Sequence, residues 1–145
     1  MSLIDELKAL YKDSDDPCLI SRTSELLPSE VLITDDVVND FVEPGDVVAL
    51  IGEFDAPSIR RMLTIISNKA IYVPLTVATK PQHNYFFDAA MVDVVINADG
   101  SMKRLRDSQT NHPMLTELRK LGHAGLVLFS SGTTGNPKAI LHDFD

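Results

Sequence analysis

The chain has 145 residues and a formal net charge of −8, from 13 basic and 21 acidic side chains. Hydrophobic residues make up 44% of the sequence and charged residues 23%, which is close to the average of globular domains. These proportions exclude a disordered chain, a collagen and a coiled coil, and the single cysteine excludes an internal disulfide framework. A chain of this length can bury one sizeable core, so we expect one ordinary globular unit.

The negative charge gives the chain no overall attraction to nucleic acid or anionic lipid, and neither is predicted as a partner. We interpret the two short basic spots, Arg60-Arg61 and Lys103-Arg104-Leu105-Arg106, as solvated faces. No apolar run reaches the ~18–20 residues of a membrane span, and no secretory signal is visible. Cys18 lies in a short apolar run and is predicted to be buried and inert. A lone cysteine also fits a reducing compartment, so we expect a cytoplasmic protein.

The first 44 residues carry short elements. Helical spacing of apolar residues predicts a helix over residues 3–12, and apolar runs at residues 18–20 and 31–33 predict two short strands. Residues 34–36 (Thr-Asp-Asp) supply an N-cap and first-turn acids for a further helix, which Pro44-Gly45 is expected to end. The predicted apolar face of this helix consists of Val37, Val38, Phe41 and Val42.

Strand and helix patterns alternate more clearly from residue 45 onward. Apolar runs predict four strands, over residues 47–51, 71–75, 92–96 and 126–129. Residues 101–110 are polar and are predicted to form a hairpin or a loop. Amphipathic spacing predicts three helices. The first helix begins near Pro57, and its apolar face consists of Ile59, Met62, Leu63 and Ile66. The second is weaker and covers residues 81–90, and the third runs from Pro113 to Gly122.

Apolar strands separated by amphipathic helices are typical of an α/β fold. We predict a mostly parallel sheet flanked by helices on both faces, in a three-layer αβα arrangement. The predicted organisation is an N-terminal segment of short elements over residues 1–44, followed by an α/β subdomain over residues 45–145. The last part of this subdomain contains a loop rich in Gly, Ser and Thr.

That loop follows the last predicted strand, and residues 126–138 read L-V-L-F-S-S-G-T-T-G-N-P-K. Glycines allow backbone N–H groups to converge on an anion, while hydroxyls add donors and a lysine adds a mobile charge. The carboxyl end of a strand is where open α/β sheets bind ligands. We therefore interpret the loop as a phosphate cradle rather than a surface turn without a ligand. The candidate phosphate contacts are Ser130, Ser131, Gly132, Thr133, Thr134, Gly135 and Lys138.

The loop does not match the G-x-x-x-x-G-K-[ST] pattern, because Pro137 precedes Lys138 and Ala139 follows it. It resembles instead the signature phosphate-binding loop of adenylate-forming enzymes, which include acyl- and aryl-CoA synthetases, adenylation domains of peptide synthetases, and luciferases. The upstream segments Pro44-Gly45-Asp46-Val47-Val48-Ala49-Leu50 and Ala70-Ile71-Tyr72-Val73-Pro74-Leu75 resemble two strands of the same family in order and spacing. The resemblance covers residues 30–143 and implies the fold of an N-terminal subdomain of these ligases.

The resemblance also implies a reaction in two steps. A carboxylic acid attacks the α-phosphate of ATP bound with magnesium, which gives an acyl-adenylate and pyrophosphate. A thiol, that of coenzyme A or of a carrier pantetheine, then accepts the acyl group. In this scheme the seven candidate residues hold the β- and γ-phosphates. Ala139 stands where the family usually has Gly, and such departures leave the identity of the acid open.

The family's other functional segments lie downstream of this loop. They include an aromatic-Gly-x-Thr-Glu segment for adenine and magnesium, an Asp for the ribose and a Lys in a mobile C-terminal domain. No Gly-x-Thr-Glu occurs in the 145 residues. We therefore expect an N-terminal fragment of a larger ligase that is inactive alone, and we predict no catalytic residue within it.

Two alternatives remain open at this point. One is a free-standing nucleotide-binding, phosphate-binding or regulatory module that carries the same subdomain. The weaker one is a flavodoxin-like protein, which would need its phosphate loop after the first strand rather than the last. Truncated surfaces predict self-association of the chain.

The remaining candidates are given structural interpretations. The spacing of His83, His112 and His123 does not suggest a metal site, so no metal ligand is predicted. Asp35-Asp36 are interpreted as helix N-terminal charge rather than as a catalytic pair. Glycines and exposed polar groups predict a mobile loop over residues 131–137.

Overall fold

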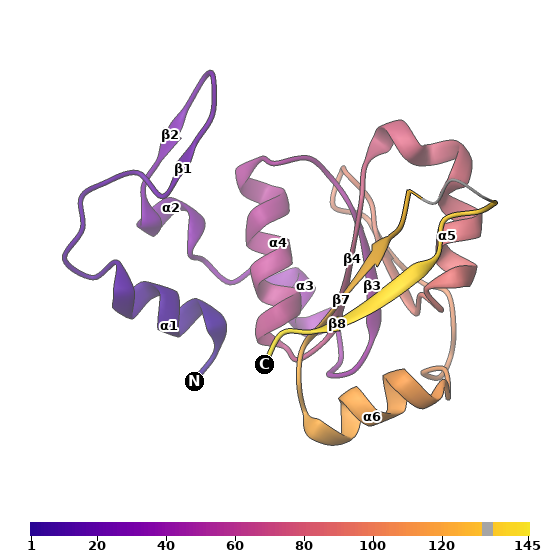
Figure 1. Cartoon of the computed structure of the whole chain (residues 1–145). Coiled ribbons are helices and arrows are strands. Elements are labelled where there is room, and N and C mark those ends of the chain that lie inside the picture. The colour runs from indigo at the N-terminus through magenta and orange to yellow at the C-terminus, as the bar shows by residue number, and fades with distance from the viewer. Residues whose placement is uncertain (132–134) are drawn as a thin grey trace.

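A six-stranded sheet forms the centre of the molecule in the computed structural model, which describes residues 1–131 and 135–145 (Figure 1). The strand order is β6-β5-β3-β4-β7-β8. The strands are β3 (Val47–Ile51), β4 (Ile71–Leu75), β5 (Val94–Ile96), β6 (Met102–Arg104), β7 (Gly125–Phe129) and β8 (Ala139–Asp143).

The four inner strands are parallel, and the two edge strands are antiparallel to their neighbours. All five residues of β3 are buried, as expected for a central strand covered on both faces. The prediction of a mostly parallel sheet is confirmed, with two antiparallel edges. Edge strand β6 returns from β5 as the hairpin that was one of the two options for residues 101–110. Edge strand β8 follows the predicted phosphate loop and was not predicted.

Helices cover both faces of the sheet, so the predicted three-layer arrangement is confirmed (Figure 1). Alternate residues of β3 point to opposite faces. Val48 and Leu50 belong to the core cluster with α3 and α4, whereas Val47 and Ala49 belong to the cluster with α5 and α6. The bounds are α3 (Asp36–Phe41), α4 (Ala56–Ser67), α5 (His83–Ala89), which continues the 3-10 turn η1 (Val77–Gln82), and α6 (Pro113–Leu121).

Local sequence signals explain where these helices begin and end. Asp55 caps α4 because its carboxylate accepts a hydrogen bond from the N–H of Ser58 at 2.9 Å. Asp35 caps α3 in the same way through Val38. Helix α6 begins at Pro113 and ends before Gly122, which adopts the left-handed conformation with φ of 69°. The predicted starts of these helices and the stop of α6 at Gly122 are confirmed. Helix α3 ends at Phe41, before the predicted stop at Pro44-Gly45, because the backbone is already extended at Val42.

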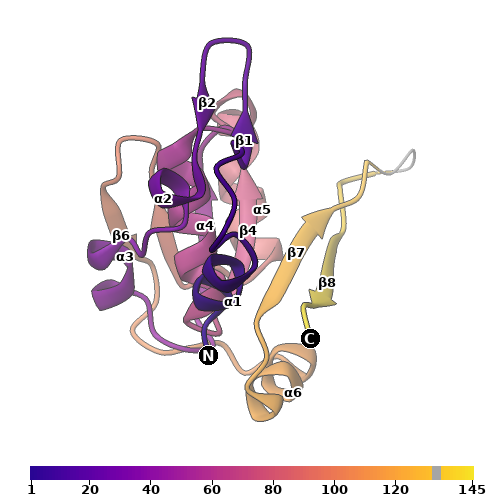
Figure 2. The same cartoon turned by 90° about the vertical axis from the view of Figure 1, so that its left-hand side faces the viewer.

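The N-terminal segment packs on the outer side of α4. Helix α1 (Leu3–Leu10) begins with a capping box between Ser2 and Asp5. Ile4 and Leu32 form a small buried cluster with Leu63 of α4. Between these residues the chain forms a two-stranded hairpin, seen at the top of Figure 2, and one helical turn. Their bounds are β1 (Leu19–Ile20), β2 (Glu25–Leu26) and α2 (Pro28–Val31).

Three expectations for this segment were wrong. Residues 31–33 do not form a strand, because Pro28 begins the turn α2 and the carboxylate of Glu30 accepts the N–H of Leu27 at 2.8 Å. Cys18 is half-buried, since the short hairpin next to it has no core of its own. Val37 is 65% exposed and lies on the outer face of α3. A division of the chain after residue 44 stays a prediction.

Within the part of the chain that the structure describes, no helix has both the length and the apolar character that crossing a bilayer requires.

Candidate functional site

Ser130 and Lys138, the first and last residues of the predicted phosphate loop, lie at one end of the β7–β8 hairpin, which projects from the body of the molecule in Figure 2. Ser130 follows β7 directly, so the loop leaves the sheet at the edge where the parallel strands end. Open α/β sheets bind ligands outside the carboxyl ends of their strands.

Two hydrogen bonds close the base of the loop. The N–H of Ser130 donates to the carbonyl of Lys138 at 2.9 Å, and the N–H of Lys138 donates to the Oγ of Ser130 at 3.0 Å. These contacts extend the β7–β8 ladder by one pair beyond Phe129 and Ala139. The loop is therefore the connection of a β-hairpin, with its two ends fixed side by side.

The described loop residues are open to solvent. Ser131, Gly135 and Lys138 are exposed, and Ser130 is half-buried. Gly135 has φ of 105°, a conformation that side chains disfavour, and a Cβ there would meet no atom within 4 Å. Of the predicted phosphate contacts, Gly132, Thr133 and Thr134 lie outside the described residues, and so does the centre of the segment predicted to be mobile.

Helix α5 contacts the loop at both ends. The ring of Phe86 packs against that of Phe129, the last residue of β7, with centroids 4.3 Å apart. The hydroxyl of the adjacent Tyr85 donates a hydrogen bond to the carbonyl of Pro137 at 2.6 Å. Sequence reasoning did not single out Tyr85, because no motif connects it to a residue 52 positions away.

A cavity of about 1100 Å³ lies on the other side of α5, at the carboxyl ends of β3 and β5. Both apolar and polar side chains line this cavity. The polar and charged ones include Lys80, Asn84, Asn97 and Lys103. His83 is buried at its edge, and its Nε2 lies 3.0 Å from the carbonyl of Thr76 and 3.2 Å from the hydroxyl of Thr79. The imidazole of His83 thus fixes the turn before α5, which agrees with a structural role.

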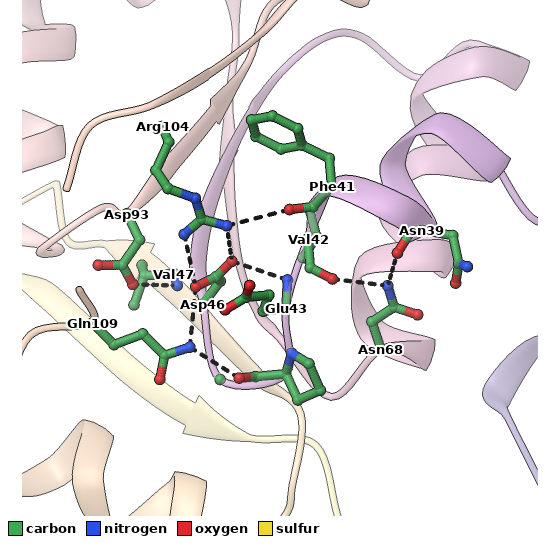
Figure 3. Close-up of polar contacts among 12 residues, drawn as sticks. Asn39, Phe41, Val42, Glu43, Asp46, Val47, Asn68, Asp93, Arg104 and Gln109 are labelled. Carbon is green, nitrogen blue, oxygen red and sulfur yellow. Dashed lines mark hydrogen bonds and ion pairs between the residues drawn. The ribbon is translucent and has the colours of Figure 1, made fainter. Parts of the chain in front are cut away.

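The amino ends of β3 and β5 carry a second group of polar residues, shown in Figure 3. Asp46 is fully buried, and its carboxylate accepts hydrogen bonds from Arg104 at 2.9 Å, from the amide of Gln109 at 3.0 Å and from the N–H of Glu43 at 3.0 Å. Arg104 also donates to the carbonyl of Phe41 at 3.2 Å. These bonds tie α3, β6 and the segment before α6 to the base of the sheet.

Asp93 lies beside this group and is also fully buried. Its Oδ2 accepts the N–H of Val47 at 2.8 Å and lies 3.6 Å from Nη2 of Arg119 on α6. Desolvation raises the pKa of Asp93, and the nearby carboxylate of Asp46 acts in the same direction. Among the described residues, Asp93 Oδ1 and Arg119 Nη2 are buried without a hydrogen-bond partner.

The interpretation of the basic spots as solvated faces was wrong for their arginines. Besides Arg104, Arg106 donates to the carbonyl of Val92 at 3.2 Å, and Arg60 donates to that of Glu30. Arg61 lies 3.6 Å from the carboxylate of Asp35. A planar guanidinium can reach carbonyls and carboxylates that the linear sequence does not connect. The arginines of these spots therefore make internal contacts.

The other predicted candidates are placed as follows. His112 caps α6, where its Nδ1 accepts the N–H of Met114 at 3.3 Å. His123 lies 2.9 Å from the carboxylate of Asp143, and with Asp145 these residues bring three potential ligand atoms within 4.8 Å of one another. Spacing alone did not suggest this cluster, because the hairpin brings residues 20 positions apart together. It lies at the Gly125 end of the hairpin, five residues along β7 from Ser130, a distance of roughly 17 Å.

Comparisons with known proteins identify solved structures that share this fold. The chain matches no family model and no curated protein. Solved structures do match it. The N-terminal subdomain of NpsA from Klebsiella oxytoca, in complex with 3-hydroxybenzoyl-AMSN, superposes with a TM-score of 0.67 over 97% of this chain at 18% identity. The O-succinylbenzoate coenzyme A synthetase MenE from Bacillus subtilis, in complex with AMP, superposes with a TM-score of 0.64 over 99% at 14% identity.

The chain has the fold of a part of the N-terminal subdomain of adenylate-forming enzymes. The fold that its loop motif implied is therefore confirmed. This chain spans 40% of the length of the NpsA N-terminal subdomain structure and 42% of the MenE chain.

Proposed function

We propose that this chain supplies the part of an AMP-forming ligase that binds the phosphates of ATP. The ligase would activate a carboxylic acid as an acyl-adenylate and pass the acyl group to a thiol, either that of coenzyme A or that of a carrier pantetheine. The observation that carries the proposal is the position of the S-S-G-T-T-G-N-P-K loop. It stands at the carboxyl end of β7, in a fold shared with NpsA and MenE.

The residues of the loop suit a polyphosphate. Lys138 contributes a positive charge, Ser130 and Ser131 contribute hydroxyl donors, and exposed backbone N–H groups can point at an anion. Their role in the proposed reaction is to position the β- and γ-phosphates and to stabilise the charge that collects on the leaving pyrophosphate. The full set that we propose for this role is Ser130, Ser131, Gly132, Thr133, Thr134, Gly135 and Lys138.

Magnesium enters this proposal bound to ATP. Residues 130–138 contain no carboxylate, and Mg²⁺ prefers carboxylate and phosphate oxygens. The His123, Asp143 and Asp145 cluster lies at the opposite end of the hairpin, too far to share an ion with phosphates at the loop. The loop residues therefore bind the phosphate oxygens directly, and the ion supplies charge neutralisation from the phosphate side.

We propose further that the 145-residue chain binds ATP or pyrophosphate without catalysing adenylation. The absence of a Gly-x-Thr-Glu segment from these residues supports this, because the family uses that segment for adenine and magnesium. The test is acid-dependent ATP–pyrophosphate exchange by the purified chain over a panel of aliphatic and aromatic acids. We expect binding of pyrophosphate in calorimetry and no exchange. Exchange above the level of a buffer control would contradict inactivity of the chain, and absence of any binding would contradict the phosphate site.

We also propose that the reaction takes place in the cytoplasm. ATP and coenzyme A are abundant in the cytoplasm, and a single half-buried cysteine fits a reducing compartment. The boundary between an N-terminal segment and the α/β subdomain after residue 44 stays a prediction. Val38 of α3 and Val42, the residue that follows α3, belong to the core cluster of the sheet.

A further inference from the structure

One peptide unit at the end of the phosphate loop is held at both of its polar atoms. The carbonyl of Pro137 accepts a hydrogen bond from the hydroxyl of Tyr85 at 2.6 Å. The N–H of the same peptide unit, which belongs to Lys138, donates to the Oγ of Ser130 at 3.0 Å. With both atoms engaged, this peptide plane cannot rotate without breaking one of the two bonds. Together with the bond that the carbonyl of Lys138 accepts from the N–H of Ser130, the orientation of that plane fixes the Cα–Cβ direction of Lys138.

The two partners of this peptide unit come from rigid elements. Ser130 continues β7 and forms a second bond, from its N–H to the carbonyl of Lys138 at 2.9 Å. Tyr85 lies on α5. The next residue of this helix, Phe86, is buried and anchors the helix, because its ring packs against that of Phe129 with centroids 4.3 Å apart. Tyr85 itself is 38% exposed, so its ring contributes little to the core. Its ring lies edge-on to that of Phe86, with centroids 5.9 Å apart, and its hydroxyl bond is its contact with the loop.

We propose that Tyr85 is a positioning residue for Lys138. By fixing the Pro137–Lys138 peptide against α5, it directs the ammonium group toward the place where the phosphates bind, and so reduces the conformational entropy lost when an anion is bound. This inference rests on the proposed function, because it assigns Tyr85 to the same phosphate site. It adds a residue of α5, a helix that carries no part of the loop motif, to the residues that determine the affinity for phosphate.

The test compares three proteins with inorganic pyrophosphate as the probe. Tyr85→Phe removes only the hydroxyl. Tyr72→Phe is the matched control, because Tyr72 is a half-buried tyrosine of β4 that packs against the core cluster of α3 and α4. The affinity of each is measured by NMR titration, and urea unfolding is measured in parallel. We expect Tyr85→Phe to bind pyrophosphate about fivefold more weakly, the effect of one lost hydrogen bond. We expect Tyr72→Phe to bind like the wild type.

A spectroscopic signature separates positioning from a general structural effect. The ¹³Cε resonance of Lys138, assigned by its loss in Lys138→Arg, reports on the ammonium group at saturating pyrophosphate. We expect its ligand-induced shift to be smaller in Tyr85→Phe, while the urea midpoint stays that of the wild type. A Tyr85→Phe protein with wild-type affinity and an unchanged Lys138 shift would overturn the inference. So would a loss of affinity that is accompanied by an equal loss of stability.

Failure of this inference is distinguishable from failure of the proposed function. If wild-type chain binds pyrophosphate and Tyr85→Phe binds it equally well, the phosphate site stands and the role of Tyr85 does not. If the wild-type chain does not bind pyrophosphate at all, both are overturned.

Discussion

Arg104 and Asp46 form an ion pair across the base of the sheet, with Nη2 and Oδ2 2.9 Å apart (Figure 3). The Asp46 side chain is fully buried, whereas that of Arg104 is 30% exposed. The Arg104 guanidinium also lies over the ring of Phe41, 5.7 Å from its centroid. The pair joins edge strand β6 to the residue directly before the central strand β3, so it holds together segments 58 positions apart in the sequence.

Replacement of Arg104 by Met should destabilise the fold. It leaves the buried Asp46 carboxylate without its cationic partner, although Gln109 and the N–H of Glu43 still donate to it. We expect the free energy of unfolding to fall by about 2–3 kcal/mol, slightly less than is typical of a fully buried broken pair. Urea unfolding followed by circular dichroism measures this change.

Lys103→Met is the matched control for Arg104→Met, because Lys103 is the adjacent exposed residue of β6. Lys103→Met should change the free energy of unfolding by no more than about 0.5 kcal/mol. Equal unfolding midpoints for the two variants would show that the Asp46 pair does not contribute to stability.

Asp93 should make the stability of the chain depend on pH. Desolvation raises its pKa above the ordinary value of 3.8, so the folded chain binds this proton more tightly than the unfolded chain does. The contribution of such a carboxyl to stability is therefore present at low pH and is lost as the pH rises through the raised pKa. Asp93→Asn lacks this titration while it retains an oxygen that can accept the N–H of Val47.

The measurement is urea unfolding of wild type and Asp93→Asn from about pH 4 to about pH 7.5. The stability of the wild type relative to the variant should decrease as the pH rises. The carboxyls whose pKa is lowered titrate in both proteins and cancel in the comparison; they are Asp5, Asp55, Asp99 and Asp143. A difference that is constant with pH, or that grows as pH rises, would contradict the assignment.

The β7–β8 hairpin should mediate self-association of the chain. Leu128 and Ile140 face each other across the two strands and are 41% and 45% exposed. β8 is also an edge strand with unpaired backbone groups on its outer side. Static light scattering should show a mass that increases with protein concentration, and Ile140→Lys should reduce that increase.

Val37→Lys is the control for Ile140→Lys, because Val37 is an exposed apolar residue on α3, away from the hairpin. It should associate like the wild type. A wild-type chain that stays monomeric at every concentration would contradict the prediction.

The sequence predicted the central elements well because each carries a strong local signal. The apolar run of β3, the Asp55 cap with Pro57 of α4, and the Pro113 to Gly122 span of α6 all determine their own structure. The edge strand β8 has no such signal. It is mostly exposed, and it forms because the hairpin places it beside β7. Residues 31–33 are apolar but belong to a helical turn and its end, since Pro28 and Glu30 outweigh their strand preference.

The loop motif can be found in the sequence because it is contiguous, and its role in binding phosphate stays a prediction. The sequence could not predict the contacts of the loop with α5, which depend on how the chain folds back. Tyr85 and Pro137 carry no local pattern that connects them. The same holds for Arg104 and Asp46, whose charges look like ordinary surface charges until the sheet brings them together.

The affinity of the chain for pyrophosphate with and without the Lys138 ammonium tests the central proposal most directly. Isothermal calorimetry would compare the wild type with Lys138→Ala, and with Lys120→Ala on the exposed side of α6 as a control for charge. We predict weak binding by the wild type and by Lys120→Ala, and binding about tenfold weaker or worse by Lys138→Ala, because a charge-assisted contact is lost. Equal affinities of the wild type and Lys138→Ala would contradict the account and show that the loop is not the phosphate site.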